Sequence, residues 1–89
     1  MSYVSAFLAK DAAGIFPFQG HGLINGSRED ALIKAMNELR SGEILRLFID
    51  QNPIKLINKL VVKYGSKLVF QYLQNCDGAV IIDFKKLSD

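Results

Sequence analysis

The apolar and polar positions of this chain follow two different periods, and the order of these periods predicts one small fold. Apolar residues spaced three and four positions apart, as on the buried face of a helix, occur in 27–39 and 53–64. Short apolar runs or strict alternation, both typical of strands, cover 16–25, 43–50, 67–75 and 79–85. The predicted order of elements is therefore β-α-β-α-β-β.

Turn and cap residues stand at the expected junctions between these elements. Ser41-Gly42 is expected to end the first helix, and Asp77-Gly78 predicts a hairpin between the last two strands. Asn52 is expected to cap the second helix, with Pro53 at its first position. The predicted buried stripe of the second helix consists of Leu56, Ile57, Leu60, Val61 and Tyr64.

Right-handed crossovers after the first two strands should place both helices on the same face of a mixed four-stranded sheet. The fold class is therefore α/β, more narrowly an α+β two-layer sandwich. Residues 1–17 are expected to form an N-terminal arm or an extra strand, and 18–89 the domain. The other sheet face would be apolar, so either the N-terminal arm or a second subunit should cover it, the latter as a homodimer. Its apolar residues are Ile44, Phe48, Val69, Leu73 and Ile81.

Composition narrows the class of protein without identifying an activity. Eighty-nine residues, 49% of them hydrophobic, suffice for one folded domain with a single core. One cysteine forms no internal disulfide, which fits a reducing compartment such as the cytoplasm. No run approaches the roughly 20 apolar residues that span a bilayer, and the N-terminus lacks a basic signal region. We expect a cytoplasmic protein without a membrane partner.

The segment from Leu39 to Pro53 contains a helix end, a Gly-Glu turn, a strand and an Asp-x-x-Pro step. This pattern resembles the TusA/SirA-like family of small sulfur carriers, and the similarity extends roughly over 18–86. Tyr72-Leu73, near the end of the third strand, is similar to an uncharacterised branch of that family. The resemblance implies that the first three strands run parallel and that the fourth is antiparallel to them.

The chain departs from this family at the residue that matters for its chemistry. Family carriers place Cys-Pro-x-Pro at the start of the first helix, where the helix N-terminus stabilises a thiolate. This chain has Asn25-Gly26-Ser27-Arg28 there, so no persulfide can form at that position. Gln51 stands where the uncharacterised branch commonly has a histidine. The resemblance thus favours a small non-enzymatic binding or interaction module, without cofactor and dimeric.

The predicted ligand-binding corner lies at the carboxyl end of the first strand. It consists of His21, Asn25, Ser27 and Arg28. Parallel α/β sheets bind ligands at strand carboxyl ends, and free N–H groups at a helix N-terminus favour anions. The simpler interpretation is a well-capped helix. One histidine and a distant cysteine do not make a ligand set, so no metal site is predicted.

Cys76 is the only thiol and supports an alternative function, a divergent sulfur carrier. Asp77 beside it disfavours the thiolate, and no lysine or arginine is adjacent in sequence to stabilise it. A passive loop cysteine is therefore the favoured interpretation.

A basic stripe on the second helix supports the third hypothesis, a nucleic-acid-associated domain. Lys55, Lys59 and Lys63 recur every fourth residue and would meet a phosphate backbone or an acidic partner. No aromatic residues interleave with them, and a solvated face explains the spacing fully. Nucleic acid is accordingly the less favoured partner.

Overall fold

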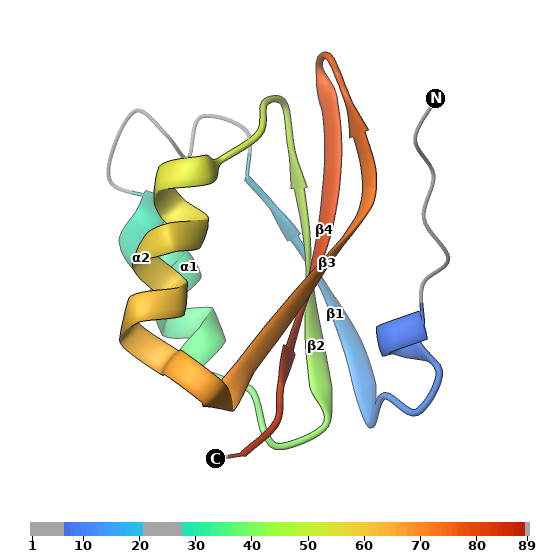
Figure 1. Cartoon of the computed structure of the whole chain (residues 1–89), viewed down its shortest axis with the longest axis vertical. Coiled ribbons are helices and arrows are strands. Elements are labelled where there is room, and N and C mark those ends of the chain that lie inside the picture. The colour runs from blue at the N-terminus through green and yellow to red at the C-terminus, as the bar shows by residue number, and fades with distance from the viewer. Residues whose placement is uncertain (1–6, 21–27, 89) are drawn as a thin grey trace.

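Two helices cover one face of a four-stranded sheet, as Figure 1 shows for the computed structural model. The structure describes residues 7–20 and 28–88. In chain order the elements are a 3₁₀ helix η1 (Phe7–Ala9), β1 (Gly14–Gln19), α1 (Arg28–Glu38), β2 (Glu43–Ile49), α2 (Ile54–Tyr64), a 3₁₀ helix η3 (Gly65–Lys67), β3 (Leu68–Cys76) and β4 (Ala79–Lys86).

The strand order in the sheet is β1-β2-β4-β3. β1 pairs with β2 in parallel, whereas β4 is antiparallel to both of its neighbours, β2 and β3. β1, β2 and β3 therefore point the same way and β4 points the opposite way. The predicted fold class, the order of elements and the strand directions are confirmed.

The core lies between the helices and the sheet and follows from the alternation of each strand. Every second residue of β2 and β4 is a buried aliphatic or aromatic side chain that faces the helices. These residues are Leu45, Leu47, Ile49, Val80, Ile82 and Phe84. α1 and α2 close the core with Leu32, Met36, Leu39, Leu56, Ile57 and Leu60. Val61 was predicted in this stripe but is 44% exposed, because it lies at the margin of the arc centred on Leu56, Ile57 and Leu60.

Two predicted boundaries were wrong. The first strand occupies 14–19 rather than 16–25, because pairing with β2 begins at Gly14 opposite Glu43. Asn52 does not cap α2: Pro53 is the N-cap residue, and no side chain makes a cap hydrogen bond. The Asn52 carboxamide oxygen instead accepts a hydrogen bond from the Tyr72 hydroxyl, which ties this loop to β3.

The first helix ends earlier than Ser41-Gly42, and a lysine of β4 satisfies its last carbonyls. The Lys86 ammonium donates to the backbone oxygens of Met36, Asn37 and Leu39 at 3.0–3.3 Å. A cation at this position also complements the negative end of the helix dipole. Gly42 belongs to the following turn, in which Glu43 N–H donates to Arg40 O and Gly42 has φ +88°. A type II turn requires such a residue at its third position.

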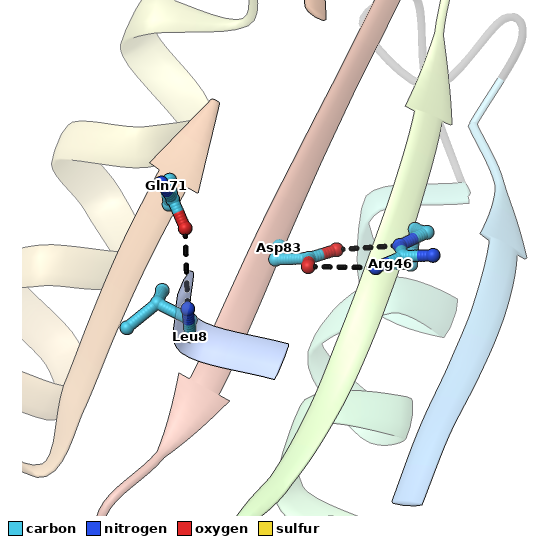
Figure 2. A network of polar contacts seen from close by, with 4 residues as sticks. All are labelled: Leu8, Arg46, Gln71 and Asp83. Carbon is cyan, nitrogen blue, oxygen red and sulfur yellow. Dashed lines mark hydrogen bonds and ion pairs between the residues drawn. The ribbon is translucent and has the colours of Figure 1, made fainter. Parts of the chain in front are cut away.

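An ion pair lies at the centre of the sheet face opposite the helices. Arg46 of β2 donates from Nε and Nη2 to the two carboxylate oxygens of Asp83 on β4, at 2.8 and 3.0 Å (Figure 2). The two residues are direct neighbours in the β2–β4 register. The Asp83 side chain is completely buried and that of Arg46 is 26% exposed. Bidentate geometry of this kind is the strong form of the arginine–carboxylate contact.

η1 lies against the same face and is fixed there by polar contacts. The Leu8 N–H donates to Gln71 Oε1 at 3.3 Å, and Lys85 Nζ donates to the Leu8 carbonyl at 3.2 Å (Figure 2 shows the first contact). Of the apolar residues predicted on this face, Ile44 and Leu73 are buried within the single chain. Phe48, Val69 and Ile81 are half-buried. The N-terminal segment thus contacts the face that the sequence predicts to be covered.

Candidate functional site

A cleft of about 500 Å³ lies where β2 ends and both helices begin. Its walls come from the first turn of α1, the β2–α2 loop and the first half of α2. The lining residues are Glu29, Gln51, Asn52, Pro53, Ile54, Lys55, Leu56 and Lys59. This is the strand end at which parallel α/β sheets place ligands.

The start of α2 presents unused backbone donors to this cleft. The first bond of the α-helical pattern runs from Ile57 N–H to Pro53 O at 2.9 Å. The N–H groups of Lys55 and Leu56 precede it, and an α-helix leaves such groups without an intrahelical acceptor. No side chain caps this end, because Asn52 is engaged by Tyr72. The cleft wall therefore combines backbone donors with the positive end of a helix dipole.

The charges of the cleft are two ammonium groups and one carboxylate among its lining residues. Lys59 Nζ forms an ion pair with Glu29 Oε1 at 2.5 Å, which joins α2 to α1 across the cleft. Lys55 is exposed at the mouth. Lys63, one turn beyond Lys59, does not line the cleft, and its ammonium lies 5.7 Å from the centroid of the Tyr64 ring. The predicted basic stripe is thus divided: two lysines face a cavity and one does not.

Of the predicted ligand-binding corner, the structure describes only Arg28. His21, Asn25 and Ser27 fall outside the described residues. Arg28 begins α1 and directly precedes Glu29, which forms part of the cleft wall. The start of α1 thus lies at the same cleft as Lys55 and Lys59, which the sequence assigned to a separate site.

Cys76 lies at the end of β3, apart from the residues that line the cleft. It ends β3 at the hairpin, half-buried, and pairs with Ala79 in the sheet register. It does not line the cleft. Within the described part of the chain, no group of three or more histidine, cysteine, aspartate or glutamate side chains is placed to hold a metal ion.

Sequence reasoning missed the loop residues Gln51 and Asn52 and the role of Glu29 in the cleft wall. Asn52 was assigned to a cap, and Gln51 was considered only as a replaced histidine. The available signal was positional: the loop after a buried parallel strand is where ligands bind. Glu29 had no such signal, because its proximity to Lys59 depends on how the two helices pack.

The chain matches no protein-family model, no curated protein and no solved structure. Its resemblance to sulfur carriers therefore stays a prediction. Neither described helix is long and apolar enough to cross a membrane.

Proposed function

We propose that this protein is a non-enzymatic binding module that holds a small anionic ligand in the cleft between the starts of α1 and α2. The observation that supports the proposal is the convergence of Lys55, Lys59 and the uncapped first turn of α2 on one cavity. Ammonium groups and free helix N–H groups together form an anion site, since both direct positive charge at the same point.

The lining also indicates the kind of ligand. Pro53 and Leu56 contribute apolar surface, and Gln51 and Asn52 contribute carboxamides beside the lysines. A cavity of about 500 Å³ is in the range of small-molecule sites. A carboxylate or phosphate group attached to a short apolar body fits these features.

In the Glu29–Lys59 ion pair, the Glu29 carboxylate competes with an anionic ligand for the Lys59 ammonium. Replacing Lys55 or Lys59 by glutamine replaces a charged donor to the anion by a neutral one. A hydrogen bond to a charged group contributes about 1.5–3 kcal/mol, so each change should weaken binding about tenfold or more. Glu29→Gln should act in the opposite direction and tighten binding, since it frees Lys59 and removes a like charge.

The test is an NMR titration of ¹⁵N-labelled protein with pyrophosphate at constant ionic strength. We expect the amide signals of Glu29, Lys55 and Leu56 to shift together along one binding curve. Lys63→Gln is the matched control, because it removes the same charge from the same helix outside the cleft. Equal loss of binding in Lys59→Gln and Lys63→Gln, or weaker binding in Glu29→Gln, would contradict a specific site and leave only a diffuse basic surface.

A further inference from the structure

The two edges of the sheet differ in their capacity to accept another strand. No described strand pairs with the outer side of β1 or of β3. On β1, Gly20 N–H donates to Phe48 O at 2.7 Å, so Gly20 faces β2. Because backbone direction alternates along a strand, the backbone groups of Phe16 and Phe18 also point toward β2, and those of Pro17 point outward. Proline has no N–H to donate, and this is a known way of blocking an edge strand.

β3 has no such block at its outer edge. Leu87 N–H donates to Lys67 O at 2.7 Å, which makes these two residues a hydrogen-bonded pair of the antiparallel ladder. Because the pairs alternate, the backbone groups of Leu68, Phe70 and Tyr72 point away from β4. The Leu68 N–H donates to Gly65 O, so Leu68 contributes only its carbonyl to this edge. Beyond Tyr72 the register shifts, so the regular part of the edge ends there.

The side chains of β3 also lack the usual protection against pairing. None of its nine residues is charged, whereas edge strands are commonly guarded by lysine or another charge. Phe70, at the centre of the outward-facing run, is 39% exposed. It packs against Tyr72 and Phe84, with ring centroids 6.2 and 6.1 Å apart, so its position is fixed although its outer side is open.

The adjacent side of α2 extends this apolar surface. The Glu29 contact shows that the Lys59 side of α2 faces α1. At 100° per residue, Ile54 and Val61 lie about 140° and 160° around the helix from Lys59. They are 60% and 44% exposed. Residues of α1 and of β1 line a common hollow, so α1 covers β1. α2 therefore covers the opposite side of the sheet, and Ile54 and Val61 lie toward the β3 edge.

We infer that two copies of this chain pair through β3, antiparallel across a two-fold axis at Phe70, to form one continuous eight-stranded sheet. Phe70 then stands opposite Phe70 of the second copy, and Leu68 stands opposite Tyr72. The Phe70 pair exchanges two N–H···O bonds in the ladder, and Tyr72 N–H donates to the Leu68 carbonyl of the other copy, because Leu68 N–H already donates to Gly65 O. Ile54 and Val61 of the two α2 helices meet above the joined strands.

A second copy suits this surface because the surface is complementary to itself. Phe70 stands at the centre of the outward-facing run, and Leu68 and Tyr72 stand two positions before and after it. Like charges directly opposite each other would destabilise a two-fold strand pair, and β3 has none. Lys55, Lys59 and Lys63 lie on the other part of α2, which removes the main source of repulsion between the helices.

The test is sedimentation equilibrium over about a hundredfold range of concentration, since dimerisation obeys mass action. We expect wild type to dimerise and Phe70→Lys to weaken the dimer at least about tenfold, because it sets two charges opposite each other. Val62→Lys is the control: Val62 is 85% exposed on α2, about 60° from Lys59 and away from the edge. Circular dichroism verifies that each variant is folded.

Hydrogen exchange supplies a readout that does not depend on any substitution. The amides of Phe70 and Tyr72 should become slower to exchange as protein concentration rises, and those of the β1 edge should not. A wild-type protein that stays monomeric overturns the inference. So does a dimer that survives Phe70→Lys with unchanged exchange at the β3 edge, which would place the contact elsewhere, including on the opposite sheet face.

Discussion

The Arg46–Asp83 pair should respond very differently to the loss of each partner. Arg46→Met leaves the carboxylate of Asp83 in a site with no exposed side-chain surface. Asp83→Asn leaves a guanidinium whose side chain is 26% exposed and can turn toward water. The asymmetry follows from burial, because both residues lose the same two hydrogen bonds.

The magnitudes follow from this difference in burial. Removing one partner of a buried ion pair costs about 3–5 kcal/mol when the remaining charge stays uncompensated. We expect Arg46→Met to lower the free energy of unfolding by about 3 kcal/mol, at the lower end because Arg46 is partly exposed. Asp83→Asn should cost about 1–2 kcal/mol, the value of hydrogen bonds lost where water replaces them. The double change Arg46→Met with Asp83→Leu should cost less than the sum of Arg46→Met and Asp83→Leu by at least about 2 kcal/mol.

Equilibrium unfolding in urea, followed by far-ultraviolet circular dichroism because the chain has no tryptophan, measures these free energies. A double-mutant cycle then isolates the coupling between the two side chains. The reasoning is refuted if Arg46→Met costs no more than Asp83→Asn. It is equally refuted if the two single costs of the cycle add within about 0.5 kcal/mol, the range found for independent sites.

Three further outcomes test the fold. Lys86→Met should destabilise the protein by about 2 kcal/mol, since the Asn37 and Leu39 carbonyls lose their donor and the Met36 carbonyl keeps only the Leu39 N–H. Lys67→Met on the exposed η3 should change stability little in the same urea assay. Burial raises the pKa of Tyr64 above its ordinary value of 10.0, so the folded state holds this proton more tightly. The stability that this raised pKa provides should be fully present below pH 10 and lost as the pH rises above 10. A Tyr64→Phe variant should show neither this loss of stability nor the late phase of an absorbance titration at 295 nm. Gly42→Ala should lower the free energy of unfolding in the urea assay by about 1 kcal/mol, because alanine is strained at φ +88° although the space for a methyl group is adequate.

The sequence predicted the elements because each rests on local information, whereas the full set of strand directions was implied by the resemblance to sulfur carriers. Periodicity separates helices from strands, and the crossover rule assigns both helices to one face. The strand order did not follow, because β4 can pair with β3 alone or insert between β2 and β3 without any change in pattern. The burial of Asp83 depends on that order: the residue is buried where Arg46 is its neighbour on β2.

The candidate site was predictable only in part for a similar reason. Lys55 and Lys59 follow from helical spacing, and the strand-end position of the loop indicates a binding region. The Glu29–Lys59 contact joins residues 30 positions apart, and the Lys86 contact joins β4 to the end of α1. Contacts of this length arise from packing between elements, which alternation and cap signals do not encode.

The place of β4 in the sheet has a consequence for how the chain acquires its structure. β4 is synthesised after β3 but lies between β2 and β3 in the sheet. β2 and β3 therefore cannot become parts of one sheet before β4 has emerged from the ribosome. Lys86, on the same strand, then supplies the donor that α1 lacks until that moment. A nascent chain that stops before β4 would therefore hold an isolated parallel β1–β2 pair and an incompletely capped α1. Entry of this one strand should complete the sheet, the core and α1 in a single cooperative step that is limited by closure of a long loop.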